Sequence, residues 1–569
     1  MKLWIKHKKI RLIFILTSLF VVSFGFISLK DKEFEIVKNL DIFFSLFNEL
    51  NRFYVDDTQP DKLIESAIDG MLGSLDPYTT FIPEEDLADF NFMTTGEYGG
   101  IGAFIRKGGD YALVAEPYEN FPAQLSGLKA GDTILSIDGV STRGKEISSV
   151  SELLKGTPNT NLVVKIKRIG TKGILEKTLT RSKITIPNVP YFGFVGDQIG
   201  YIRLANFTKD AGLEVKEALI KLKEAGAGSI IIDLRGNPGG LLIESVNVSN
   251  LFVARNQEIV STRGKVKQWD NSYRTTVDPV DVSIPLVVLV NRTSASASEI
   301  VAGALQDLDR AVIIGQRTFG KGLVQTTRPL SYNTQLKVTT AKYYIPSGRC
   351  IQAVDYAHRN EDGSVGYIPD TLIREFTTQN GRKVFDGGGI APDIALEPMF
   401  LSNIALSLLT KNLIFDYATI FASKRNTAFQ VVAGLKLSDS DYNDFLGFLR
   451  GKSYDYSTES DNQLEELIKV ARREKYYTEA ETEFGALKQK LAHDKEKDLQ
   501  NFGNEIKELL YQEIASRYFF QKGRIQASIE DDPELDKAIE VLKNPQFYTS
   551  VLQRSYGAAN VRAGMSKSN

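Results

Sequence analysis

The sequence is poor in the two residue types that most often bind metals. Cys350 is the only cysteine among 569 residues, so the chain cannot form an intramolecular disulfide or a metal cluster held by several thiolates. Histidine occurs three times, as His7, His358 and His493, each in a lysine-rich or otherwise polar stretch. A histidine-based triad or zinc site would have to draw on these three residues. We therefore expect no metal site, and a hydrolase of this sequence would use another base.

An excess of charge of one sign is also missing. The chain has 69 Lys and Arg against 71 Asp and Glu, a formal net charge of −2. A nucleic-acid-binding protein would carry a basic excess, so we expect no nucleic-acid partner. The hydrophobic fraction of 42% and the charged fraction of 25% exclude a mostly disordered or multi-span membrane chain. Because 569 residues exceed what one hydrophobic core supports, we expect three or four domains.

The N-terminus carries a basic segment followed by one long apolar run. Five Lys and Arg residues within residues 1–11 precede the apolar residues 12–29, a pattern typical of a signal sequence or a single membrane anchor. A weak small-residue pattern at residues 23–25 favours cleavage, whereas the length of the run allows an uncleaved span. We favour a retained anchor over cleavage and over a buried core helix. The rest of the chain would then lie on the non-cytoplasmic, periplasmic side.

The remaining chain changes its pattern several times. Residues 34–91 follow the apolar spacing of amphipathic helices, with a turn at residues 75–78. Residues 199–392 alternate strands and helices, which predicts an α/β layer with crossover helices covering a sheet. Beyond residue 400 the pattern is helical and rich in charge. The strands expected in the α/β layer span residues 201–204, 230–233, 286–290 and 312–314, and the helices span residues 212–225, 241–252 and 297–308.

Between the helical and α/β parts, residues 96–105 join a glycine-rich loop to a strand. Successive backbone N–H groups of such a loop can converge on an anion, and the strand edge can accept an extended peptide. Most glycine-rich loops only make turns, but with the stretch AGDTILSIDG at residues 130–139 the segment resembles a PDZ domain. The resemblance implies a β-barrel-like fold whose loop holds a ligand's C-terminal carboxylate. This peptide-binding loop would consist of Gly100, Ile101, Gly102 and Ala103.

Two segments of the α/β part end a strand and open a helix. In DLRGNPGG, residues 233–240, glycines allow positive φ and expose amides at a helix N-terminus, which suits an oxyanion hole; the alternative is a tight turn. In NRTSASASE, residues 291–299, a serine lies on a sharp turn beside the free amides of the first helical turn. Ser296 and Glu299 also have the S-x-x-E spacing of a capping box, so the serine alone could be a helix cap.

A third segment, residues 318–325, follows the strand expected at 312–314 and places a lysine between glycines. If residues 321–325 are extended, Lys321, Leu323 and Gln325 project from one face of the strand. The Gln325 amide carbonyl could then orient the Lys321 amine. The alternative is a solvated surface lysine.

The order of these three segments behind a PDZ-like module resembles the C-terminal processing peptidases, also called tail-specific proteases. The resemblance runs from about residue 44 to 392 and includes the motifs at residues 75–79, 343–349 and 388–393. It implies a multidomain α+β protein with an α/β serine protease domain of the ClpP/crotonase type. It also implies an endopeptidase without cofactors that cleaves proteins recognised by their C-terminal tails. A segment resembling an export signal fits this expectation.

The family's catalytic residues carry over onto positions of this sequence. The nucleophile is the middle serine of the S-A-S-A-S-E run and the base is a lysine 25 residues later, which selects Ser296 over Ser294 and Ser298 and assigns Lys321 as the base. Gln325, four positions past the lysine, would orient it. A lysine must lose about 4.6 kcal/mol of preference for its charged form to act near neutral pH, so we expect Lys321 to be largely desolvated.

The oxyanion donors carry over to the backbone amide of Ala297 and to one glycine of the Gly239-Gly240 pair, of which we prefer Gly239. Cys350 departs from the family, which often has Ser or Thr there, and we attach no function to it. The division that follows is a signal or anchor segment at 1–30, a helical domain at 34–95, a PDZ domain at 96–185, a protease domain at 186–397 and a helical extension at 398–569.

Other functions remain open at this stage. A catalytically silent PDZ scaffold would have no reason to keep Ser296, Lys321 and Gln325 together. An acyl hydrolase of non-peptide substrates would have no need of a PDZ-like module, although related folds host many chemistries. The resemblance also implies a homodimer through the helices of residues 34–91. The C-terminal extension could be an assembly surface, a lid or a docking site for an adaptor.

Overall fold

The computed structural model describes residues 33–553, except 361, 426–428, 430–431 and 492–493. The expected signal or anchor segment, residues 1–30, lies outside the described residues. The chain divides into two compact units, Met1–Phe81 and Ile82–Asn569. Across the described residues no single helix is long and apolar enough to cross a membrane, and one bent pair of helices, Asn403–Thr410 with Leu413–Lys424, passes this test together.

From residue 33 on, the first unit is mainly helical, as its apolar spacing predicts. Residues 33–53 form one helix, and α2 (Pro60–Gly73) forms a second, which begins with proline at a position where no amide donor is needed. The predicted turn after α2 is confirmed. The Asp76 carboxylate accepts hydrogen bonds from the amides of Tyr78 and Thr79, both at 2.9 Å.

The PDZ segment forms a sheet that closes around a small apolar core. The loop-bearing strand β2 (Glu97–Gly100) pairs with β9 (Ser182–Thr185), which returns the chain to its starting edge. Two helices, α4 (Pro122–Leu125) and α5 (Ile147–Leu154), flank the sheet. The sheet itself runs β3 (Ala103–Gly108), β4 (Tyr111–Pro117), β5 (Thr133–Ile137), β7 (Asn161–Lys167) and β8 (Leu175–Thr180).

The α/β segment contains a six-stranded sheet that is parallel except at one edge. The strand order is β10-β11-β12-β15-β16-β23, and only β10 runs antiparallel to its neighbour. The expected strands and helices are all present, with ends shifted by at most a few residues. They are β11 (Ile199–Arg203), β12 (Ser229–Asp233), β15 (Leu286–Val290) and β16 (Val312–Gly315), with α6 (Ala211–Glu224), α7 (Leu242–Asn250) and α8 (Ala297–Asp307). The outer strands are β10 (Tyr191–Phe194) and β23 (Ile394–Ala395).

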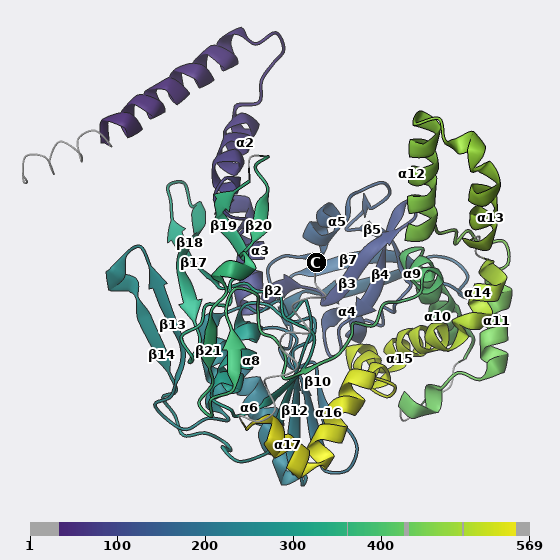
Figure 1. Cartoon of the computed structure of the whole chain (residues 1–569). Coiled ribbons are helices and arrows are strands. Elements are labelled where there is room, and N and C mark those ends of the chain that lie inside the picture. The colour runs from purple at the N-terminus through teal and green to yellow at the C-terminus, as the bar shows by residue number, and fades with distance from the viewer. Residues whose placement is uncertain (1–32, 361, 426–428, 430–431, 492–493, 554–569) are drawn as a thin grey trace, which may run out of the picture. The chain divides into compact units, whose positions relative to one another are not determined.

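Both faces of this sheet are buried, but by helices from distant parts of the chain. In β12, Ile230 and Ile232 pack into the core formed with α6, α7 and α8, whereas Ile231 faces the opposite side. That side is covered by α16 (Pro533–Lys543) and α17 (Pro545–Val551), drawn in yellow beside the sheet in Figure 1. A parallel sheet must be covered on both faces. The end of the C-terminal extension therefore completes the core of the protease segment.

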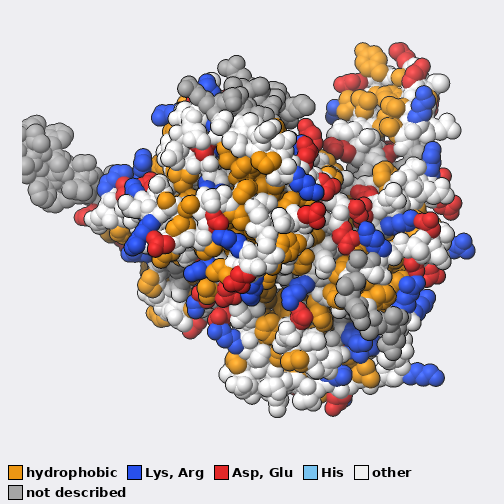
Figure 2. Space-filling model, turned by 90° about the horizontal axis from the view of Figure 1, so that it is seen from below, with side chains coloured by type: hydrophobic (Ala, Val, Ile, Leu, Met, Phe, Trp, Pro, Cys, Tyr) orange, Lys and Arg blue, Asp and Glu red, His pale blue; other side chains and the backbone are white. Residues whose placement is uncertain are grey.

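The rest of the extension forms a helical domain with its own core, as its charge-rich helical pattern predicts. Its core helices are α9 (Asn403–Thr410), α10 (Leu413–Lys424), α11 (Asp439–Leu449) and α15 (Gly503–Ser528). A hairpin of α12 (Glu459–Arg473) and α13 (Glu481–Leu491) extends from this domain (Figure 1). On the face of the molecule in Figure 2, acidic and basic side chains are interspersed, in keeping with the near-neutral net charge.

A second, antiparallel sheet lies within the protease segment and carries the predicted lysine segment to its edge. It contains β13 (Glu258–Gly264), β14 (Asn271–Arg274), β17 (Leu323–Pro329) and β18 (Gln335–Tyr344). The sequence pattern did not predict β1 (Thr80–Ile82), a strand of only three residues. Helix α3 (Leu87–Thr95) follows it and leads into the PDZ segment.

Candidate active site

Three loops that carry the predicted catalytic segments meet at one edge of the parallel sheet. β12, β15 and β16 are parallel neighbours, so the loops that follow them leave from the same ends of the strands. The carboxyl ends of parallel strands are where ligand sites of α/β sheets are usually built. These loops carry the predicted oxyanion, serine and lysine segments, respectively.

Ser296 lies between β15 and α8 in a backbone conformation that non-glycine residues rarely adopt. Its φ of 55° and ψ of −114° place it on a sharp, strained turn of the kind found at functional sites. Ser296 is the N-cap residue of α8 and forms a capping box with Glu299, whose Oε2 accepts from the Ser296 amide at 2.8 Å. The capping box expected from the S-x-x-E spacing is therefore present, but it does not by itself account for the strained backbone of Ser296.

The two neighbouring serines have structural roles. Both are fully buried. Ser294 Oγ donates to the carbonyl oxygen of Leu234 at 2.8 Å, and Ser298 Oγ donates to that of Asn237 at 2.9 Å. Each hydroxyl ties the serine loop to the oxyanion loop, and Ser296 is the half-buried serine of the three.

The Glu299 carboxylate connects the serine loop to the lysine loop. Its Oε2 accepts from the amides of Ser296 (2.8 Å) and Lys321 (2.9 Å), and its Oε1 accepts from the Gly320 amide (2.7 Å) and the Thr318 hydroxyl (2.5 Å). Glu299 is completely buried. Burial raises the pKa of its carboxyl to about 7, although all four donors favour the ionised form. One carboxylate thus fixes the backbones of both predicted catalytic residues.

Tyr343 provides a second connection between the two loops. Its hydroxyl donates to the carbonyl oxygen of Lys321 at 2.5 Å and lies 3.3 Å from that of Ser296. The ring is buried in the main core of the protease segment. The backbones of Ser296 and Lys321 therefore share two bonding partners, Glu299 and Tyr343.

Gln325 lies in β17, where side chains do not alternate between the two faces as regularly as the sequence pattern predicts. β17 begins at Leu323, and a bulge between Val324 and Gln325 interrupts its register against β18. The Gln325 amide nitrogen donates to Thr339 Oγ1 at 3.1 Å, across the strand pair. This bond orients the Gln325 side-chain amide with its nitrogen toward Thr339 and its carbonyl oxygen away from Thr339.

The oxyanion loop packs directly against Ser296. Gly239 has φ of +94°, and a Cβ added there would lie 2.6 Å from the Ala295 carbonyl oxygen and 2.8 Å from the Ala297 amide nitrogen, so this position requires glycine. The two predicted donors, Gly239 and Ala297, thus lie side by side. The Gly239 amide donates to Asn237 Oδ1 at 2.9 Å, and an oxyanion would have to share or take over this donor.

In the PDZ loop, the backbone is held from within the domain. The amides of Tyr118 and Ala123 donate to the carbonyl oxygens of Gly102 (2.9 Å) and Ile101 (2.7 Å). Gly102 has φ of +71°, and an added Cβ would lie 2.5 Å from Phe121 Cβ. These bonds hold the loop through its carbonyl groups and do not use the loop's own amides.

Tyr98 covers this loop. A Cβ on Gly100 would lie 2.6 Å from Cε2 of the Tyr98 ring. Burial raises the pKa of Tyr98, while hydrogen bonding to the amides of Ala103 and Gly102 acts in the opposite direction. The phenol oxygen therefore lies against the amides that would receive a ligand carboxylate.

Sequence reasoning missed the roles of Glu299, Tyr343 and Asn237. Glu299 was visible only as half of a capping box, and its bonds to residues about 20 positions away leave no local signal. Tyr343 and Asn237 lie inside the quoted motifs, which could have drawn attention to them.

Comparison with known proteins identifies the family of this chain. Residues 198–358 match peptidase family S41, residues 113–168 match a PDZ domain, and residues 404–542 match a family described as "Probable PDZ-protease, C-terminal helical domain". A carboxy-terminal-processing protease from Bartonella bacilliformis is 37% identical over 367 residues, 64% of this chain and 81% of that protein. A probable CtpA-like serine protease from Staphylococcus aureus is 36% identical over 320 residues, 55% of this chain and 62% of that protein.

Among solved structures, a photosystem II D1 C-terminal processing protease is 30% identical, with 63% of this chain and 93% of that chain covered and a TM-score of 0.34. The family expected from the sequence motifs is thereby confirmed by the relatives and the matched domains. The chain belongs to the carboxy-terminal-processing proteases, serine-type peptidases of family S41 that carry a PDZ domain.

Proposed function

We propose that Ser296 is the nucleophile and Lys321 the general base of a serine endopeptidase. In this mechanism the neutral Lys321 amine accepts the Ser296 hydroxyl proton, the serine oxygen attacks the scissile carbonyl, and the resulting ammonium protonates the leaving amine. Water then attacks the acyl-enzyme with the same lysine as base. The observation that supports this assignment best is the buried Glu299 carboxylate, which binds the amides of both residues through one oxygen.

Two further groups would complete the catalytic site. We assign the amides of Gly239 and Ala297 as the oxyanion donors, each worth about 3 kcal/mol in the transition state. Gln325, whose amide nitrogen is engaged by Thr339, would present its carbonyl oxygen to the Lys321 amine. The protease segment would follow the ClpP/crotonase arrangement.

The substrates we propose are proteins recognised by their C-terminal tails. The peptide carboxylate would bind the amides of the PDZ loop, residues 100–103, and displace the Tyr98 hydroxyl. The names of the relatives from Bartonella and Staphylococcus, as a carboxy-terminal-processing and a CtpA-like protease, support this substrate class.

We further propose that the protease works outside the cytoplasm, anchored by its N-terminal segment, 1–30.

The apolar side chains exposed along the helix of residues 33–53, such as Phe44 at 65% and Leu40 at 61%, support the proposed homodimer. The division into domains at residues 34–95, 96–185, 186–397 and 398–569 is retained, and an adaptor could bind the helical extension.

Digestion of an unstructured protein with an apolar C-terminal tail tests the assignment. Ser296→Ala and Lys321→Arg should each abolish cleavage, because the first lacks the nucleophile and the second carries a base that stays protonated. Lys342→Arg is the matched control, since Lys342 is exposed on the neighbouring strand β18 and should keep activity. Cleavage by Ser296→Ala at the wild-type rate would refute the assignment and favour a silent PDZ scaffold with a contaminating protease.

A further inference from the structure

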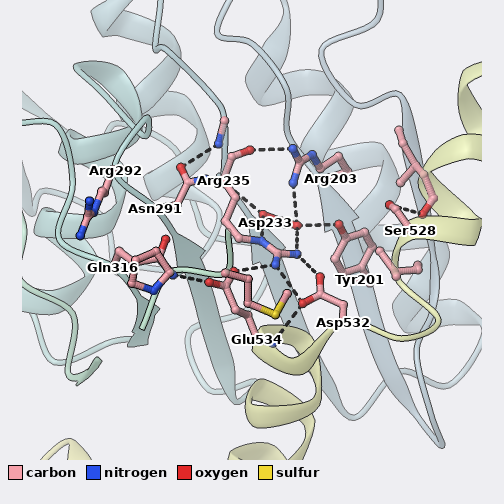
Figure 3. Close-up of a pocket in the computed structure, with 15 residues that line it drawn as sticks. Tyr201, Arg203, Asp233, Arg235, Asn291, Arg292, Gln316, Ser528, Asp532 and Glu534 are labelled. Carbon is pink, nitrogen blue, oxygen red and sulfur yellow. Dashed lines mark hydrogen bonds and ion pairs between the residues drawn. The ribbon is translucent and has the colours of Figure 1, made fainter. Parts of the chain in front are cut away.

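The C-terminal extension reaches the catalytic loops through a buried cluster of charged side chains. A cavity of about 510 Å³ opens between the carboxyl ends of β11 and β12 and the segment around the start of α16. Figure 3 shows its polar wall, where Arg203, Asp233 and Arg235 of the protease segment face Asp532 and Glu534 of the extension. This cluster is separate from the predicted dyad and from the PDZ loop.

The guanidinium group of Arg235 pairs with carboxylates of both the protease segment and the extension. Asp233 is fully buried and pairs with both Arg203 (2.7 Å) and Arg235 (2.6 Å). Burial alone would raise the pKa of Asp233, but the two guanidinium groups hold it well below its usual range. A single carboxylate cannot neutralise two guanidinium groups; with Asp532 and Glu534, each 2.7 Å from Arg235, three carboxylates face the two guanidinium groups.

Glu534 binds two catalytic loops at once. Its Oε2 accepts from Arg235 Nη1 at 2.7 Å, and its Oε1 accepts from the Gln316 side-chain amide. Arg235 lies four residues before Gly239 in the oxyanion loop, and Gln316 lies five residues before Lys321 in the lysine loop. The side chain of Glu534 is only 12% exposed, although it lines the cavity.

The oxyanion loop is stiff enough to transmit a displacement from Arg235. Asn237, two residues on, is fully buried, and its Nδ2 donates to the Leu204 carbonyl oxygen at 2.8 Å. Its own carbonyl oxygen accepts from the Ala295 amide at 3.1 Å, and its Oδ1 accepts from the Gly239 amide. A shift of the loop at Arg235 therefore moves the proposed oxyanion donor relative to the serine.

We propose that Glu534 is a positioning residue that sets the oxyanion and lysine loops relative to each other, which makes the C-terminal extension part of the catalytic machinery. The inference rests on the proposed roles of Ser296 and Lys321. It predicts that loss of Glu534 impairs the chemical step more than substrate binding. Small misplacements of catalytic groups are sufficient to reduce turnover by up to about 100-fold.

The test compares variants of the full chain in cleavage of a tail-bearing peptide, with kcat and KM measured separately. Glu534→Gln replaces an acceptor with an amide that faces the Gln316 donor, and Gln316→Met removes that donor from the other side. Each should lower kcat by about 10- to 100-fold with little change in KM. Because the Gln316 contact is one of the two contacts that Glu534→Gln alters, the double variant should be no slower than the slower single variant.

Two controls separate positioning from loss of structure. Ala538→Gly loosens α16 within the core on the sheet face, without touching the loops, and should lower the melting temperature while keeping kcat. Glu540→Gln removes a charge from the exposed side of α16, where the Glu540 side chain is 65% exposed, and should change neither.

The inference is overturned if folded Glu534→Gln keeps the wild-type kcat, if Ala538→Gly reproduces its loss, or if the effects of Glu534→Gln and Gln316→Met multiply. If Glu534→Gln does not fold, an unchanged kcat of Gln316→Met overturns it equally. Ser296→Ala measured in parallel distinguishes the two levels, since its retained activity would refute the proposed dyad rather than the role of Glu534.

Discussion

At the scale of single residues, the buried carboxylate of Glu299 shows how burial and hydrogen bonding oppose each other. Four donors point at its two oxygens, which matches the ionised form, yet burial raises its pKa to about 7. All four groups donate to the carboxylate in the structure, so a protonated carboxyl would lose at least one of these bonds. The ionised form is therefore the one that holds the Ser296 and Lys321 backbones in place.

The raised pKa of Glu299 makes stability depend on pH in a defined direction. Because the pKa is higher in the folded than in the unfolded chain, this group stabilises the fold below its unfolded value of 4.5, and the contribution is lost as pH rises through about 7. The loss amounts to about 3 kcal/mol. Chemical denaturation of wild type and Glu299→Gln from pH 4 to 8 checks this, since only wild type should show this component.

Catalysis should have the opposite pH dependence, because the ionised carboxylate fixes the two loops. We expect kcat to fall on acidification through about pH 7, together with the titration of a carboxyl that is absent in Glu299→Gln. A carboxyl titration near 4.5 in the folded protein would contradict both expectations.

At the scale of elements, the apolar pattern of the sequence predicted the helices and strands whose bounds depend on neighbouring residues. The strand at residues 286–290 has the bounds expected from its apolar run, α6 differs from expectation by one residue at each end, and α8 differs by one residue at its C-terminal end. The bulge between Val324 and Gln325 was not predictable, because register depends on the partner strand β18. Glu299 appeared as a helix cap for the same reason: its partners in the lysine loop are distant in sequence.

The glycine-rich loop of the PDZ domain gives a prediction for one element. Gly102→Ala combines a left-handed backbone conformation with a Cβ placed 2.5 Å from Phe121 Cβ, and should destabilise the PDZ domain by about 1–3 kcal/mol and weaken binding of tail peptides. Calorimetric titration with a tail peptide measures the binding.

Gly109→Ala is the matched control for Gly102→Ala. It has a similar φ of +63°, but an added Cβ meets nothing within 4 Å, so it should cost less and leave peptide affinity unchanged. Equal losses of peptide affinity in the two variants would show that the loop does not bind the tail.

At the scale of the whole molecule, the extension contacts every domain of the second unit. Its last helices cover the protease sheet, and Glu534 accepts a hydrogen bond from Arg235 in the predicted oxyanion loop. The sequence of α16 predicts an amphipathic helix. It does not predict which surface the helix covers, because its packing on the parallel sheet depends on residues that are distant in the sequence. The sequence left the role of the extension open, as an assembly surface, a lid or a docking site, and did not predict that its last helices cover the protease sheet.

The extension also holds the PDZ domain. The Arg106 guanidinium lies 3.7 Å from the centroid of the Phe415 ring, and Arg524 pairs with Glu116 at the end of β4 at 2.5 Å. Between the helical core and Arg524, α15 is kinked at Phe520, whose φ of 54° and ψ of −151° are costly for a bulky residue. The strained kink directs the end of α15 toward the PDZ domain.

Arg524→Ala tests whether this contact sets the position of the PDZ domain. The Glu116 side chain is only 11% exposed, and leaving it unpaired should cost about 1–3 kcal/mol and accelerate hydrogen exchange in β4 and the end of α15. Lys522→Ala removes the neighbouring pair with Glu119, whose side chains are 64% and 40% exposed, and should cost less than about 1 kcal/mol. If both variants exchange at the wild-type rate, the PDZ domain is held by its apolar contacts rather than by Arg524.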